Sequence, residues 1–116
     1  AISHAGTPMR SSAAIQKATL GAAEPPIQVG LVAMRIVALA DGMVEPANPN
    51  VLSDVGVAAA TARAALSGSI TNITVNAAFL TDDELSRDLL DRVGELERAM
   101  EQADDVAARI VERLKK

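Results

Sequence analysis

The chain has 116 residues, one histidine and no cysteine, and its formal net charge at pH 7 is −4. This length suits a single domain, and the lack of cysteine excludes disulfides, thiolate metal sites and a cysteine nucleophile. The lone His4 excludes a multi-histidine metal centre, so we expect no bound metal, and the acidic balance without Trp or Tyr argues against nucleic-acid binding.

Residues 1–10 mix glycine, proline and polar residues without a period, which predicts a loop. They contain no apolar stretch after a basic start, so they do not resemble a signal peptide, and we expect a cytoplasmic protein. Ser11 and Ser12 can cap a first helix, which the pair Pro25 and Pro26 then interrupts.

A second helix is predicted over about residues 27–43, where Arg35 and Asp41 are the only charged residues. This segment is apolar almost all round, so a membrane span and a buried bundle helix both fit its composition. Two charges in so short a stretch favour the bundle helix, and we expect no contact with a membrane.

Residues 44–50 predict a turn, because they hold two prolines and two asparagines. Ser53 and Asp54 then open a long helix of small residues. Four of these residues recur at intervals of four and share one face: Gly56, Ala60, Ala64 and Gly68. Such a face favours tight packing against another helix.

Residues 70–76 are rich in β-branched side chains, but a lone strand would have no partner, so we expect the helix to continue. Thr81 to Glu84 form a capping box for a last helix of about 50 Å, with a preceding helix about half as long. Its heptad-like apolar seam runs through Leu85, Leu89, Val93, Leu96, Met100, Ala103, Ala107, Ile110 and Leu114.

These elements predict one all-α domain over residues 1–116, an antiparallel helical bundle with a long C-terminal helix. Alanine is the commonest apolar residue, with 23 copies, and Phe79 is the only aromatic residue, so the core buries little area per residue. We therefore expect a partner to complete the bundle, either a second copy of the chain or a missing N-terminal half.

One stretch of the sequence indicates a function more specifically than the composition does. Residues 48–59, NPNVLSDVGVAA, resemble the NPNxxSDxGVAA signature of the cyclodeaminase/cyclohydrolase family. Further similarity to this family, over about residues 11–90, lies in AIQKA at 14–18, EPP at 24–26, AALSG at 64–68, NITVN at 72–76 and TD at 81–82.

The resemblance implies an all-helical homodimer that acts on a tetrahydrofolate derivative as its substrate. One branch of the family hydrolyses the methenyl bridge of methenyltetrahydrofolate, and the other expels ammonia from formimidoyltetrahydrofolate to close the ring. We favour the cyclohydrolase, because no attached formiminotransferase is present to supply the deaminase.

The family's domain is nearly twice as long, and its glycine-rich loop and acidic residue in the first half have no counterpart here. Either the other half is a separate piece, or this chain is not catalytic by itself.

The resemblance assigns the chemistry to Asp54, with Asn50 and Ser53 as orienting hydrogen-bond partners. A carboxylate can bind the amino and N–H donors of a pterin edge, or exchange a proton with a folate nitrogen. The alternative is structural: Ser53 or Asp54 caps the helix.

Asn72 and Asn76 share a helix face and are candidate substrate-binding residues. On a straight helix Asn72 lies about 27 Å from Asp54, so a common site requires a second subunit running antiparallel. The alternative is that both amides bond to backbone or neighbouring helices within the bundle.

Arg35 and Arg63 lie in apolar segments, where an unpaired charge is costly. They are candidates for binding the carboxylates of a folate glutamate tail. Internal ion pairs, for instance with Asp41 or Glu45, are the equally weighted alternative. For the whole chain, the alternative to a folate enzyme is a non-catalytic helical dimerisation or scaffold module.

Overall fold

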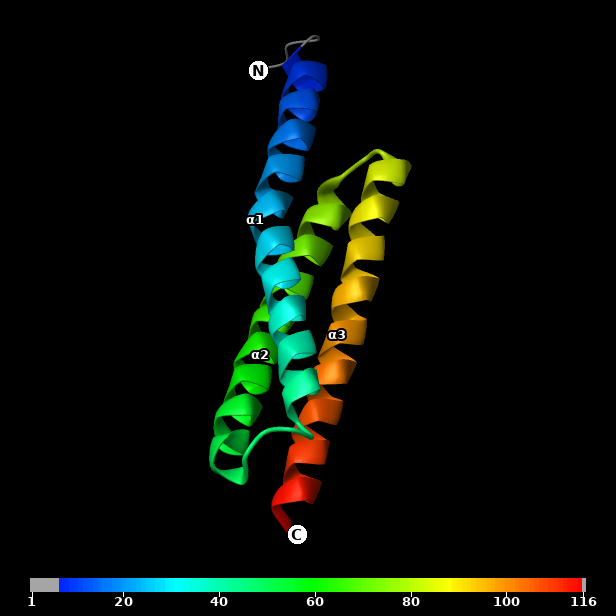
Figure 1. Cartoon of the computed structure of the whole chain (residues 1–116). Coiled ribbons are helices and arrows are strands. Elements are labelled where there is room, and N and C mark those ends of the chain that lie inside the picture. The colour runs from blue at the N-terminus through cyan, green and yellow to red at the C-terminus, as the bar shows by residue number, and fades with distance from the viewer. Residues whose placement is uncertain (1–6, 116) are drawn as a thin grey trace.

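Three long antiparallel helices make up the structure, a computed structural model that describes residues 7–115, with side chains from residue 13 onward (Figure 1). The helices are α1 (Thr7–Met43), α2 (Pro49–Phe79) and α3 (Asp83–Lys115). No strand occurs within residues 7–115, so the predicted all-α bundle is confirmed. His4 and the first part of the predicted loop lie outside the described residues.

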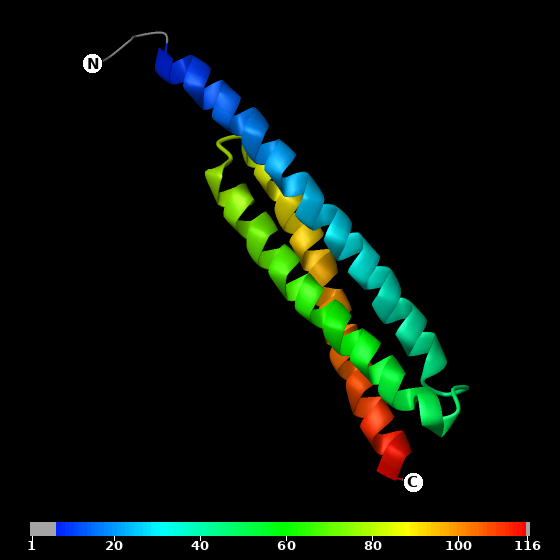
Figure 2. The ribbon, with the colours of Figure 1, turned by 90° about the vertical axis from the view of Figure 1, so that its left-hand side faces the viewer.

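The bundle is long and thin, with extents of 70 × 20 × 17 Å and a radius of gyration of 19.4 Å. A compact chain of this length would have a radius of gyration of about 13 Å. The first turns of α1 extend beyond the other two helices in both views (Figures 1 and 2). A rod of this kind leaves much of each helix surface uncovered by the chain itself.

Helix α1 is continuous through Pro25 and Pro26, so the predicted break at these prolines is wrong. The prolines lack the N–H groups that would bond to the carbonyls of Gly21 and Ala22. Both of those residues are exposed, so water can solvate the free carbonyls. Buried residues on either side of the prolines keep α1 helical through this stretch. The helix also begins earlier than predicted, at Thr7, so the last part of the predicted loop is helical.

Helix α2 begins at Pro49, four residues before the predicted start at Ser53 and Asp54. Asn48 is the cap: its side-chain oxygen accepts a hydrogen bond from the backbone N–H of Asn50 at 3.0 Å. Pro49 occupies the first helical position, where its missing N–H has no consequence. Ser53 and Asp54 therefore lie in the second turn, and neither caps the helix.

The β-branched residues 70–76 are helical, as predicted, and α2 has 31 residues. It is nearly as long as α3, with 33, and α1 has 37, so no helix within residues 7–115 has the expected half length. The cap of α3 is Asp82, one residue later than predicted, because its carboxylate accepts from the N–H groups of Glu84 at 2.9 Å and Leu85 at 3.0 Å. The predicted capping box at Thr81 is therefore wrong, although the helix begins where it should.

Gln16 of α1 holds the turn between α2 and α3. Its side-chain nitrogen donates to the carbonyl of Phe79 at 2.9 Å, and its oxygen accepts from the backbone N–H of Thr81 at 2.7 Å. Ser86 adds a bond from its hydroxyl to the carbonyl of Ala77 at 3.1 Å. Two carbonyls at the end of α2, those of Ala77 and Phe79, thus accept hydrogen bonds from side chains of the two neighbouring helices.

The core consists of two clusters along the bundle. The larger one joins all three helices around Leu66 and Ile73, and the smaller one lies beside the α1–α2 turn, around Leu52 and Val106. From the predicted seam of α3, five residues are buried: Leu89, Val93, Leu96, Ala103 and Ile110. Leu85, Ala107 and Leu114 are exposed, and Ala99 and Val106 are buried instead, because the contacting stripe shifts around the helix.

The predicted small-residue face of α2 is not packed within the chain. Gly56 is half-buried, with Ile110 of α3 close by, whereas Ala60, Ala64 and Gly68 are exposed. A side chain added at Gly68 would meet nothing within 4 Å. The close helix approach occurs elsewhere, at Gly30 of α1, where an added Cβ would lie 2.7 Å from a methyl of Leu96.

Candidate functional site

The polar residues at the start of α2 are exposed, and their side chains form no hydrogen bond or ion pair with the part of the chain whose side chains are described. Asn50, Ser53 and Asp54 all face solvent. Within residues 13–115, Asp54 forms no ion pair, and its carboxylate accepts no hydrogen bond, so it neither caps α2 nor neutralises a base. The carboxylate is therefore free to bind a ligand near the positive end of the helix dipole.

Asn72 and Asn76 lie far from Asp54 on the same unbroken helix, about 27 Å away for Asn72. The side-chain nitrogen of Asn76 donates to the backbone carbonyl of Asn72 at 2.8 Å, so this amide bonds within its own helix, as the structural alternative predicted. Asn72 is exposed, and its side chain lines a hollow beside Pro25 and Pro26. One chain does not bring Asp54 and Asn72 together.

The two candidate arginines have different surroundings. Arg63 of α2 pairs with Asp104 of α3, its Nε lying 2.6 Å from the carboxylate, and hydrogen bonding and charge from Asp104 raise the pKa of Arg63. The partner is thus neither Asp41 nor Glu45. Arg35 of α1 is exposed, with no carboxylate within 4 Å among residues 13–115, so no ion pair competes with a ligand there.

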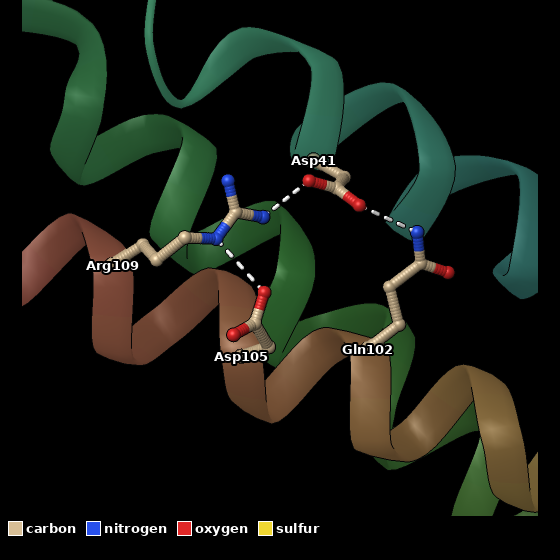
Figure 3. Close-up of polar contacts among 4 residues, drawn as sticks. All are labelled: Asp41, Gln102, Asp105 and Arg109. Atoms are coloured by element: carbon tan, nitrogen blue, oxygen red, sulfur yellow. Dashed lines mark hydrogen bonds and ion pairs between the residues drawn. The ribbon is translucent and has the colours of Figure 1, made fainter.

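Asp41 has partners on α3 that the sequence does not indicate. Figure 3 shows its carboxylate accepting hydrogen bonds from Gln102, at 2.7 Å, and from Arg109. Arg109 also donates to Asp105 one turn earlier, at 2.8 Å. The bonds from Gln102 and Arg109 lower the pKa of Asp41. A single acidic residue in an apolar helix predicts that its carboxylate has a hydrogen-bonding or charged partner. No sequence pattern identifies Gln102 and Arg109 as these partners.

A hollow lies between α1 and α2 and is here called the α1–α2 groove. Its volume is about 550 Å³, and none of its lining comes from α3. The lining is almost entirely apolar and consists of Gln28, Val29, Val32, Ala33, Ile36, Ala58, Thr61, Ala62 and Ala65. The hollow at Asn72 adjoins it, because Val29 and Ala65 line both.

The groove lies between the two groups of candidate residues on α2. Asp54 is four residues before Ala58, which lines the groove, and so lies on the same face without lining the groove itself. Asn72 lies at the far end. The face thus presents a carboxylate, an apolar middle and an amide in sequence along one helix.

The open side of α1 is more apolar than a solvent-facing helix requires. Val32 is 53% exposed and Leu39 69%, while Val37 on the opposite side is fully buried. The prediction of a buried helix over residues 27–43 therefore holds for one face only. By length and composition alone, residues 13–43 could cross a membrane, a test that core helices of soluble proteins also pass.

Within the described part of the chain, no group of three or more His, Asp or Glu residues is placed to hold a metal ion. The side chains at the start of α2 supply a carboxylate from Asp54, an amide from Asn50 and a hydroxyl from Ser53. These groups can orient a polar heterocycle by hydrogen bonds and accept a proton.

Comparison with known proteins agrees with the resemblance read from the motifs. The family described as formiminotransferase-cyclodeaminase matches residues 6–95. A methenyltetrahydrofolate cyclohydrolase of Methylorubrum extorquens is 35% identical over 104 residues, which cover 90% of this chain and 49% of that protein. The chain thus spans about half the length of this curated relative. No solved structure gives a significant match. With most of its length matched, the chain belongs to the formiminotransferase-cyclodeaminase family.

Proposed function

We propose that the chain acts in folate one-carbon chemistry, as the folate-binding part of a methenyltetrahydrofolate cyclohydrolase. The observation that carries the proposal is the free carboxylate of Asp54, held in the family's signature at the start of α2. The name of the relative favours the cyclohydrolase over the cyclodeaminase. Cyclising deamination of formimidoyltetrahydrofolate is the alternative reaction.

The chemistry of the reaction suits an anionic side chain. The methenyl bridge carries a positive charge shared between two nitrogens. Water adds its oxygen to the bridge carbon, one carbon–nitrogen bond breaks, and a formyl group remains on the other nitrogen as a proton is released. The carboxylate of Asp54 would stabilise the cationic bridge or accept that proton, while Asn50 and Ser53 orient the pterin by hydrogen bonds.

We also propose that a second copy of the chain covers the α1–α2 groove. An antiparallel copy would bury the apolar lining and bring the partner's Asn72 toward Asp54, whereas one chain holds these residues about 27 Å apart. Such a two-fold interface uses the same surface on both copies. A separate polypeptide carrying the other half of the family's domain is the alternative occupant, and self-association measurements distinguish the two.

The enzymatic proposal is tested with Asp54→Asn and, as a matched control, Asp88→Asn on the exposed side of α3. We expect Asp54→Asn to slow the loss of methenyltetrahydrofolate absorbance by at least about a hundredfold, because general acid–base groups contribute on this order. Thermal unfolding should not change, since the side chain makes no bonds in the fold. Ammonia release from formimidoyltetrahydrofolate is measured in parallel to separate the two reactions. If the wild-type protein, assayed with its full domain, shows no rate above background with either substrate, the proposal is wrong.

The second candidate is a non-catalytic helical module, favoured by the exposed small-residue face at Ala60, Ala64 and Gly68. It predicts that Gly68→Leu prevents assembly while Asp54→Asn changes nothing. Gly21→Leu is the control, because neither Gly21 nor Gly68 has a neighbour within 4 Å of an added Cβ.

A further inference from the structure

The turn between α1 and α2 is bonded to the far end of α3. The guanidinium of Arg113, in the last turn of α3, donates from Nη1 to the carbonyl of Val44 at 3.1 Å and to the carbonyl of Ala47. Val44 is fully buried, and Arg113 is itself partly buried. Carbonyls just past a helix end lack partners within the helix, and the guanidinium supplies the missing donors for both.

The same end of α3 also packs against the first turns of α2. Val106 and Ile110 join Leu52 and Val55 in the smaller core cluster. The end methyl of Ile110 lies 3.6 Å from where a Cβ on Gly56 would stand. The last turns of α3 therefore contact both the turn before α2 and the beginning of α2.

We propose that Arg113 is a positioning residue for residues 48–54, the segment with Asp54. The bond to the carbonyl of Ala47 orients the peptide that leads directly into the cap residue Asn48. The cap in turn determines where α2 begins and how its first turns, with Asn50 and Asp54, are rotated. The link to substrate rests on the proposed function, whereas the link to the turn does not.

This assignment adds a residue that the family signature does not contain, since the family match ends at residue 95. Arg113 also differs from Arg109 one turn earlier. Arg109 pairs with Asp41 and so joins α3 to α1, whereas the bonds of Arg113 to described residues go to backbone carbonyls of the turn. Their removal should accordingly affect different parts of the molecule.

The test compares Arg113→Met, Arg113→Lys and the control Lys115→Met, which removes a charge from the same helix end. Amide hydrogen exchange is followed at Ala47, Asn50 and Val51, whose N–H groups are bonded within or beside the turn. In Arg113→Met we expect at least tenfold faster exchange at these amides and unchanged exchange in the middle of α2. Lysine keeps N–H donors at this position but has a shorter side chain without the planar guanidinium. Arg113→Lys should therefore restore part of the protection, and Lys115→Met should match the wild type.

Binding of 5-formyltetrahydrofolate, a stable reduced folate, is titrated on the same variants. We expect Arg113→Met to bind at least fivefold more weakly, with partial recovery in Arg113→Lys. Unchanged exchange at the turn in Arg113→Met overturns the inference, and so does faster exchange with unchanged folate binding. If the wild-type protein binds no folate, the proposed function fails, and the exchange data still decide whether Arg113 holds the turn.

Discussion

The two faces of the α1–α2 pair have similar composition and opposite surroundings. On one face, α3 covers the pair, and side chains such as Val37 and Leu66 are fully buried. On the other face lies the α1–α2 groove, where Val29 is 49% and Val32 53% exposed. An apolar pattern therefore indicates that a helix face is buried in the assembled protein, but it does not indicate which partner covers that face. Here the chain provides the cover for one face only.

The largest expected difference between the faces concerns stability. Leu66→Ala, on the covered face, should lower the free energy of unfolding by about 2–5 kcal/mol, because it leaves a cavity in the core. Leu39→Ala is the same change at a side chain that is 69% exposed, and should stay within about 0.5 kcal/mol. Urea unfolding measures the free energy of unfolding of both variants, at protein concentrations too low for self-association. Equal losses for the two variants would contradict the description of the faces.

The open face is tested through assembly. If a second copy covers the groove, Val32→Glu should weaken self-association at least a hundredfold, because it buries an unpaired charge in the interface. Val111→Glu on α3 is the matched control, since Val111 is 52% exposed and Val32 53%. Sedimentation equilibrium gives the association constants, and circular dichroism checks that both variants stay helical. A wild-type chain that remains monomeric would exclude the homodimer.

A smaller effect is expected from the polar contact that joins α1 to α3. Because hydrogen bonds from Gln102 and Arg109 lower the pKa of Asp41 below its usual 3.8, the ionised form stabilises the fold. This stability is present above pH 3.8 and is lost as the pH falls through the lowered pKa. Asp41→Asn should cost about 1 kcal/mol near pH 7, since the pair is one-third exposed, and the cost should shrink toward acid pH. The free energy of unfolding is measured from pH 7 to pH 2, with Asp88→Asn as the control. If the ionised form of Asp41 contributed nothing, the difference between the wild type and Asp41→Asn would be the same at every pH.

Much of the fold could be predicted from the sequence, because it depends on local patterns. The turn after α1 follows from its turn residues, although residues 49–50 of the predicted turn belong to α2. The helical state of residues 70–76 and the beginning of α3 follow from context and caps. The predicted break at Pro25 and Pro26 failed because burial on both sides of the prolines outweighs the loss of two hydrogen bonds at an exposed surface. The predicted start of α2 was wrong because Ser and Asp are preferred as helix N-caps as much as Asn is, so Ser53 and Asp54 competed with Asn48.

The site was less predictable, because its geometry depends on long-range contacts. The motif identified Asp54 and the family, whereas periodicity alone implied that Asp54 and Asn72 lie apart on one helix. Nothing local indicated that Asp104 pairs with Arg63, or that Arg113 bonds to a turn 66 residues away. These partners meet only because α3 runs antiparallel along the full length of α2.

The unbroken course of α2 has a consequence for how this protein can change over time. Each residue inserted or deleted between Asp54 and Asn72 would turn one against the other by about 100° and shift it by about 1.5 Å along the axis. Substitutions within this stretch change neither the rotation of Asp54 relative to Asn72 nor the distance between them along the axis. Related sequences should therefore differ freely in side chains here while keeping a constant count of residues, with changes in length accommodated in the turns or beyond the helix ends.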